Sequence, residues 1–142
     1  MNIVYIYNYN MRLINSNQIL KNINDIIIID VREGDFKGGN IINAVNIPYS
    51  SFSERLVLEK IKLTNKKLVV HCMYSSMRGP GTYYKLDNML DDFKELYVLK
   101  NGFHNFINFC IKNNKMEYIE NFKKENWILQ HNNYTHITEV FN

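Results

Sequence analysis

Residues 68–80 read Leu-Val-Val-His-Cys-Met-Tyr-Ser-Ser-Met-Arg-Gly-Pro, and this stretch decides the fold. Its apolar, β-branched start is typical of a buried strand that ends at His71. At its other end, Gly79 permits a sharp turn and Pro80 suits the first turn of a helix. Cys72 therefore comes at the C-terminal end of a strand, which is where open α/β sheets place their functional sites.

The same alternation of strand and helix continues on both sides of this stretch. Apolar, β-branched runs predict strands at residues 3–7, 25–31, 44–48, 67–71 and 95–99. Apolar residues at helical spacing predict helices at residues 16–23, 52–63, 79–90 and 103–110. Alternation of this kind is typical of an α/β fold with a largely parallel sheet.

The length of the chain suits one domain. It has 142 residues, of which 46% are hydrophobic and 22% charged, as in a globular protein. We predict a single domain over residues 1–142, with its core at about residues 10–115. The apolar residues Ile119 and Phe122 indicate a C-terminal helical tail, which we place at about residues 116–142.

Charge and apolar content exclude several classes of partner. The net charge of +3 is too small, and the basic residues are too scattered, for a nucleic-acid-binding protein. The longest apolar run, Ile26–Ile29, is far short of a membrane span, and residues 1–10 lack the pattern of a signal peptide. Two cysteines are too few for a disulfide framework. We therefore expect a cytoplasmic or nuclear protein with no nucleic-acid or membrane partner. Its oligomeric state stays open.

Two side chains of the quoted stretch are the candidate catalytic residues. Cys72 acts as a nucleophile when its thiol is ionised, and a helix N-terminus, backbone N–H groups and the Arg78 guanidinium all favour that form. The same groups suit a tetrahedral oxyanion, because arginine binds two oxygens through a planar fork. A lone cysteine at a strand end is often only a small core residue, but the whole string is more specific. We expect an oxyanion-binding loop made of Met73, Tyr74, Ser75, Ser76 and Met77.

Three segments resemble the rhodanese-like domain of the M-phase inducer (dual-specificity) phosphatases and of the eukaryotic arsenate reductases. The quoted loop shares their His-Cys, Ser and Arg-Gly-Pro positions. Residues 30–48 resemble the family's Asp-x-Arg followed by Gly-His-Ile-x-Gly-Ala-x-x-Ile-Pro, and residues 99–103 resemble its Leu-x-Gly-Gly-Phe turn. The resemblance implies a five-stranded, mostly parallel sheet with helices on both faces, and a flat, open site.

The resemblance implies a cysteine-dependent oxyanion enzyme with a Cys-x5-Arg loop. Its substrate is a phosphoester, phosphoproteins included, if it is a protein tyrosine or dual-specificity phosphatase. Its substrate is arsenate if it is an arsenate reductase, and glutathione or glutaredoxin is then the reductant; no other cofactor is expected. Two alternatives stay open: a thiosulfate or persulfide sulfurtransferase, and a non-catalytic rhodanese binding module. The sulfurtransferases use a loop one residue shorter, and degenerate modules usually lose the cysteine.

The loop departs from the phosphatases at two positions. Met73 and Met77 stand where the M-phase inducers carry glutamates, so a general acid is missing there and its identity stays open. The arsenate reductases lack acids at these positions too, which moves the balance modestly toward arsenate reduction or a weak phosphatase. Val31 replaces the second cysteine of those phosphatases, and we interpret Cys110 as a core residue.

Three neighbouring residues are expected to support the site. Asp30 and Arg32 match the family's Asp-x-Arg, and we interpret them as a structural ion pair near the loop. His71 should orient the loop by hydrogen bonding to the backbone. Of the two loop hydroxyls, Ser76 is the better match to the one that helps in the family. The other histidines show no metal spacing with either cysteine, so no metal is expected.

Overall fold

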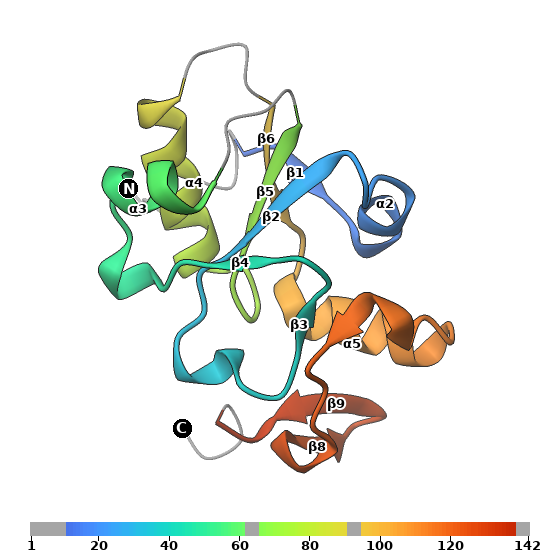
Figure 1. Ribbon diagram of the computed structural model, residues 1–142. Coiled ribbons are helices and arrows are strands. Elements are labelled where there is room, and N and C mark those ends of the chain that lie inside the picture. Colours follow the sequence, from blue (N-terminus) through green and yellow to red (C-terminus); the bar gives the residue numbers. More distant parts are fainter. Residues whose placement is uncertain (1–10, 62–65, 91–94, 139–142) are drawn as a thin grey trace, which may run out of the picture.

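The computed structural model describes residues 11–61, 66–90 and 95–138, drawn in colour in Figure 1. The strand predicted at residues 3–7 lies outside these ranges. Within them, no helix combines the length and the apolarity that a membrane span would need.

Five parallel strands form the central sheet, as predicted. Their order across the sheet is β1 (Leu13–Ile14), β6 (Leu96–Leu99), β5 (Lys67–His71), β2 (Ile26–Asp30) and β4 (Val45–Asn46). The predicted strand at 67–71 is confirmed without change, and those at 25–31, 44–48 and 95–99 are confirmed in shortened form. The edge strand β1 was not predicted, because a strand of two residues is too short to show an apolar pattern in the sequence.

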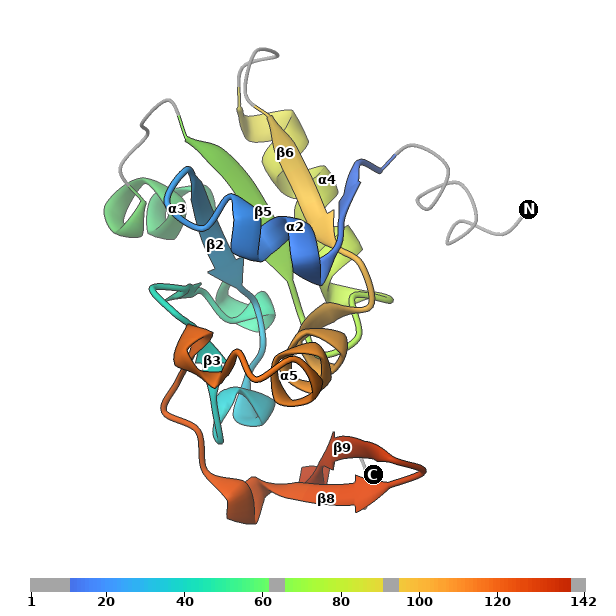
Figure 2. The same cartoon turned by 90° about the vertical axis from the view of Figure 1, so that its right-hand side faces the viewer.

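Helices cover both faces of this sheet (Figures 1 and 2). On one face lie α2 (Ser16–Lys21) and α5 (Gly102–Lys112), and on the other α3 (Glu54–Lys60) and α4 (Arg78–Met89). Val69 packs with Phe103 of α5, whereas Val70 packs with Leu86 of α4. A strand covered on both faces must be apolar on both, which explains the unbroken apolar runs of β2 and β5.

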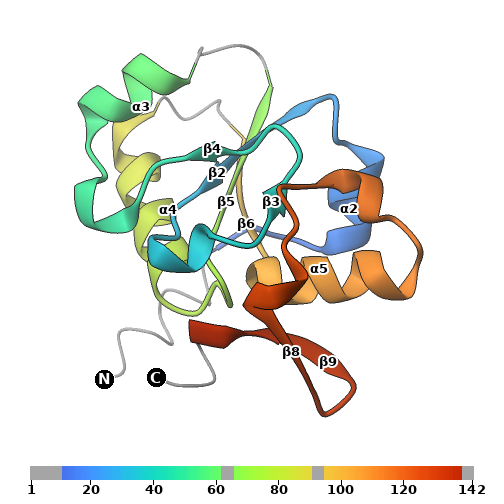
Figure 3. The same ribbon diagram turned by 60° about the horizontal axis from the view of Figure 1, so that its bottom comes forward.

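The predicted C-terminal helical tail is wrong. The segment contains the 3₁₀ turns η3 (Met116–Tyr118) and η4 (Lys124–Asn126), strand β7 (Ile119–Glu120), and a hairpin of β8 (Trp127–Gln130) and β9 (Asn133–His136). Strand β7 pairs with β3 (Asn40–Ile41), and Figure 3 shows the hairpin beside α5. Asn121, His131 and Asn132 have positive φ values of 59°, 52° and 64°, which a helix does not accept.

Tertiary contacts decide this segment. Ile119 and Trp127 are buried against the core around Phe103. The hairpin turn consists of His131 and Asn132, both in the left-handed region, as a two-residue type I′ turn requires. The apolar residues at 119 and 122 had suggested helical spacing, but Phe122 stays 37% exposed.

Candidate functional site

The loop from Cys72 to Arg78 joins the central strand β5 to helix α4. The Gly79 N–H donates a hydrogen bond to Cys72 Sγ at 3.2 Å, so the positive end of α4 faces the sulfur. A Cβ added at Gly79 would lie 3.3 Å from Ser75 Oγ and 3.6 Å from that sulfur. A side chain at residue 79 would therefore crowd the Ser75 hydroxyl and contact the sulfur.

Cys72 is more enclosed than a flat, open site implies. The residue is only 2% exposed, because it continues a buried strand and the loop folds over it. The sulfur therefore lies at the floor of the loop, and an oxyanion must enter the loop to reach it. From this position the sulfur can attack a group that is held inside the loop. It cannot attack a group that is too bulky to enter the loop.

The loop side chains point to different places. Met73 is fully buried in the core beside α5, whereas Met77 is 73% exposed. The ring of Tyr74 lies 5.0 Å from that of His104 at the rim. Ser76 is exposed, while Ser75 has a φ of 52° and its Oγ is enclosed, with no hydrogen-bond partner among the described residues. The structure thus places the hydroxyl of Ser75, rather than that of Ser76, near the sulfur.

Arg78 forms a bidentate ion pair that the sequence did not reveal. Its Nη1 donates to Asp35 Oδ1 at 3.1 Å and its Nη2 to Asp35 Oδ2 at 2.6 Å. Asp35 lies in the 3₁₀ turn η1 (Gly34–Phe36) that follows β2. Burial by itself would raise the pKa of Asp35, but the hydrogen bond and charge of Arg78 outweigh it and lower that pKa. Asp35 is therefore ionised at neutral pH.

The expected ion pair of Asp30 and Arg32 is confirmed, and both side chains are fully buried. Arg32 donates to the carboxylate from Nε at 3.0 Å and from Nη2 at 2.8 Å. Its Nη1 and Nη2 also donate to the carbonyls of Asp35 and Gly39, at 3.0 Å and 2.8 Å. Burial would raise the pKa of Asp30, but the charge of Arg32 outweighs it and lowers that pKa. The pair fixes the turn that carries Asp35.

His71 is the last residue of β5 and directly precedes the cysteine. Its Nδ1 is 3.0 Å from the carbonyl oxygen of Cys72. A carbonyl only accepts, so Nδ1 carries the proton, and the predicted hydrogen bond to the backbone is confirmed. Burial lowers the pKa of His71, although Asp30 lies 3.5 Å from Nε2 and acts in the opposite direction. The ring is therefore neutral and orients the end of β5.

The buried His71 should make the protein less stable just below pH 6.5. Its pKa in the unfolded chain is about 6.5, and its folded pKa is lower. Between these values the unfolded state binds a proton that the folded state does not, so the free energy of unfolding falls as the pH falls. Asp30, whose folded pKa is also lowered, adds a further loss below about pH 3.9, which continues until the pH has fallen through its folded pKa.

Urea unfolding between pH 7.5 and 5 measures this effect. His71→Gln should flatten the curve relative to the wild-type protein, and His131→Gln, at an exposed position, is the control for replacing a histidine. His104, whose pKa burial also lowers, adds slope in both proteins, so the difference between them is the test. An unchanged slope in His71→Gln contradicts the prediction.

Cys110 is a core residue, as expected. It is fully buried in α5, and burial raises the pKa of its thiol to about 12. An un-ionised, enclosed thiol is a poor nucleophile, so the chemistry of the site falls to Cys72.

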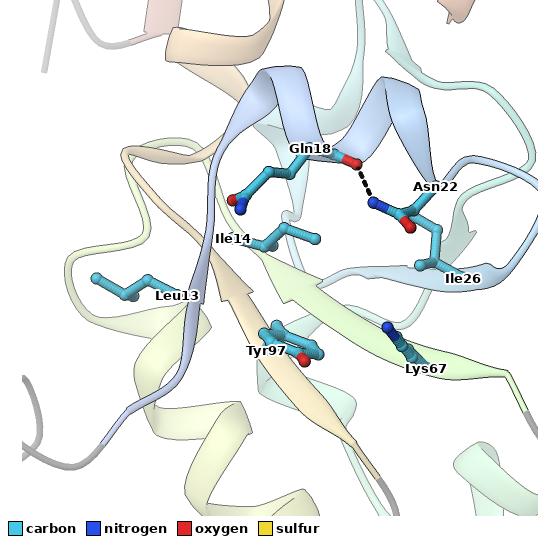
Figure 4. Close-up of a pocket in the computed structure, with 7 residues that line it drawn as sticks. All are labelled: Leu13, Ile14, Gln18, Asn22, Ile26, Lys67 and Tyr97. Carbon is cyan, nitrogen blue, oxygen red and sulfur yellow. Dashed lines mark hydrogen bonds between the residues drawn. The ribbon is translucent and has the colours of Figure 1, made fainter.

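Two hollows differ in their relation to the loop. One, of about 310 Å³, borders it and is lined by Met11, Leu13, Tyr74, Ser75, Ser76, Val98, Lys100 and Asn101. The other, of about 130 Å³, is shown in Figure 4. Its lining includes Ile26 and Lys67, the first residues of β2 and β5, so it lies at the opposite end of these strands from Cys72. Only the first hollow is placed to receive part of a substrate held in the loop.

Two phosphatases are among the proteins of similar sequence. The dual specificity phosphatase ibp1 of Schizosaccharomyces pombe is 37% identical over 73 residues, which cover 51% of this chain and 53% of the relative. The M-phase inducer phosphatase 2 of Mus musculus is 31% identical over 102 residues, which cover 59% of this chain and 18% of the relative. The chain thus spans about half or less of the length of these relatives.

Solved structures share the fold at low sequence identity. Ygr203w of Saccharomyces cerevisiae, described as a homolog of single-domain rhodanese and the Cdc25 phosphatase catalytic domain, gives a TM-score of 0.69 at 20% identity, covering 84% of this chain and 93% of that one. The As-Sb reductase of Leishmania major gives 0.63 at 17% identity, covering 93% and 97%. A thiosulfate sulfurtransferase of Pseudomonas aeruginosa gives 0.60 at 13%, covering 82% and 21%.

The family model of the rhodanese-like domain matches residues 15–109, from the N-cap of α2 into α5. This range includes the central sheet except β1, the loop from Cys72 to Arg78, and the turn η1 with Asp35. The chain belongs to the rhodanese-like family.

Proposed function

We propose that this chain is a cysteine-dependent phosphatase of the dual-specificity type, with Cys72 as nucleophile and Arg78 as the residue that binds the phosphoryl oxygens. One observation carries the proposal. The sulfur of Cys72 accepts a hydrogen bond from the Gly79 N–H at the N-terminus of α4. The Arg78 guanidinium, which is hydrogen-bonded to Asp35, lies at the end of the same loop. Relatives named as phosphatases, at 31% and 37% identity, support it.

The first chemical step is an in-line displacement. The thiolate of Cys72 attacks phosphorus, an S–P bond forms, and the P–O bond to the leaving group breaks with its electron pair going to that oxygen. Arg78 and the helix N-terminus stabilise the charge on the equatorial oxygens. Water then hydrolyses the thiophosphate, which releases phosphate and restores the thiolate.

Protonation of the leaving group limits the substrate range. Met73 and Met77 carry no proton to give, and the ionised Asp35 is paired with Arg78. Leaving groups that depart without a proton are therefore favoured. Aryl phosphates, including phosphotyrosine, should react faster than alkyl phosphates such as phosphoserine.

Arsenate reduction is the second candidate, because the arsenate reductases that the loop resembles also lack acids at the positions of Met73 and Met77. In that reaction the thiolate of Cys72 displaces hydroxide from arsenate, and glutathione or glutaredoxin supplies the electrons that reduce arsenic. Sulfur transfer is less well supported, because the loop from Cys72 to Arg78 holds one residue more than in sulfurtransferases.

Three assays on the purified protein separate these functions. They use an aryl phosphate, arsenate with glutathione and glutaredoxin, and thiosulfate with cyanide. We expect turnover of the aryl phosphate. Turnover of arsenate alone would replace the phosphatase by the second candidate. Turnover of thiosulfate alone would overturn the proposal that this is an oxyanion enzyme.

A further inference from the structure

We propose that Asp35 is a positioning residue that holds the Arg78 guanidinium in place at the expense of affinity for anions in the ground state. The inference rests on the proposed function for its catalytic part, and on geometry for the rest. It concerns a carboxylate that the loop motif does not contain and that the chain supplies from a turn 43 residues earlier.

The contact occupies the part of arginine that recognises anions. Both terminal nitrogens of Arg78 bond to the two oxygens of one carboxylate, which is the arrangement that arginine also offers to phosphate. The Arg78 side chain is 29% exposed, and ordering such a long side chain when a substrate binds costs conformational entropy. Asp35 thus removes part of that cost before substrate arrives.

Asp35 itself is well fixed on its own side. Its Oδ1 accepts a hydrogen bond from the Glu33 N–H at 3.0 Å, and its carbonyl accepts one from the buried Arg32. The next residues are held by the C-terminal hairpin, because the carbonyl of Lys37 lies 2.6 Å from His136 Nε2 and that of Gly38 accepts from Trp127 Nε1 at 3.1 Å. Because the Asp35 carboxylate is held in place, its two hydrogen bonds also restrain the position of the Arg78 guanidinium.

The negative charge of Asp35 acts against the same substrate. An ionised carboxylate beside the anion site repels phosphate and engages the guanidinium that phosphate needs. In the transition state, however, the benefit of a correctly placed guanidinium is larger than in the ground state. Removing the charge should therefore strengthen the binding of phosphate and slow the reaction, two changes of opposite sign.

The test compares Asp35→Asn with Glu33→Gln. The second variant removes the same charge two residues away, from an exposed side chain that accepts from the Ser50 N–H and does not contact Arg78. In Asp35→Asn we expect kcat for an aryl phosphate to fall about 10-fold. We expect the Kd of inorganic phosphate, measured by calorimetry, to fall about 3- to 10-fold. Glu33→Gln should leave both within about twofold, and Asp35→Glu should recover part of kcat.

A structural readout does not depend on turnover. The guanidinium N–H signals of Arg78 in NMR should be those of an ordered side chain in the wild-type protein and should broaden or average in Asp35→Asn. An unchanged Arg78 signal overturns the proposal, and so does an unchanged kcat or weaker phosphate binding in an Asp35→Asn protein that unfolds at the wild-type temperature. Absence of turnover in the wild-type protein would count against the phosphatase function alone, because the NMR comparison still decides the role of Asp35.

Discussion

Cys72→Ser should abolish turnover, lowering kcat by a factor on the order of 10⁴ or more. A serine hydroxyl stays protonated at neutral pH, and no side chain described near it is placed as a base: the His71 ring bonds the backbone, and Asp35 is paired with Arg78. The position at the helix N-terminus stabilises an anion but does not remove a proton from a hydroxyl. The measurement is the initial rate with an aryl phosphate at saturating substrate.

Cys110→Ala is the matched control. Its thiol is buried in α5 and has a pKa of about 12, so its removal should leave kcat per folded molecule unchanged. The variant should unfold at a lower temperature, because it leaves a small cavity in the core. Loss of kcat in Cys110→Ala together with retention in Cys72→Ser would show that Cys110, and not Cys72, is the nucleophile.

The central part of the site could be predicted from sequence because it is local. An apolar strand, a loop of fixed length and a helix start follow one another along residues 67–80, and chain connectivity alone brings Cys72, Arg78 and the helix N-terminus together. The pairing of Asp30 with Arg32 is local for the same reason, since they are two residues apart.

The rest of the site depends on contacts between distant segments. Asp35 reaches Arg78 only because β2 and β5 are neighbours in the sheet, and no pattern around residue 35 marks it as part of the site. The choice between Ser75 and Ser76 depends on a positive φ at residue 75, which the sequence does not encode in a visible way. The C-terminal hairpin was missed because its stability comes from Trp127 and its neighbours packing on α5.

Asp30→Asn should lower the free energy of unfolding by about 3–5 kcal/mol, because it leaves the Arg32 guanidinium charged and buried without a counter-charge. The loss is large relative to the about 5–15 kcal/mol that keeps a typical domain folded. Urea unfolding at pH 7 measures it. Glu59→Gln, which breaks an exposed pair with Arg55, is the control and should cost at most about 1 kcal/mol.

The substitution Asp30→Asn should also affect the geometry of the candidate active site. Arg32 donates to the carbonyl of Asp35, so an Arg32 side chain that has lost its partner no longer fixes the turn from which Asp35 holds Arg78. Asp30→Asn should therefore lower kcat in molecules that remain folded, whereas Glu59→Gln should not. The double variant Asp30→Asn/Arg32→Met removes the buried charge and should regain part of the lost stability, but not the lost kcat. Equal stability of Asp30→Asn and Glu59→Gln would show that this ion pair does not support the fold.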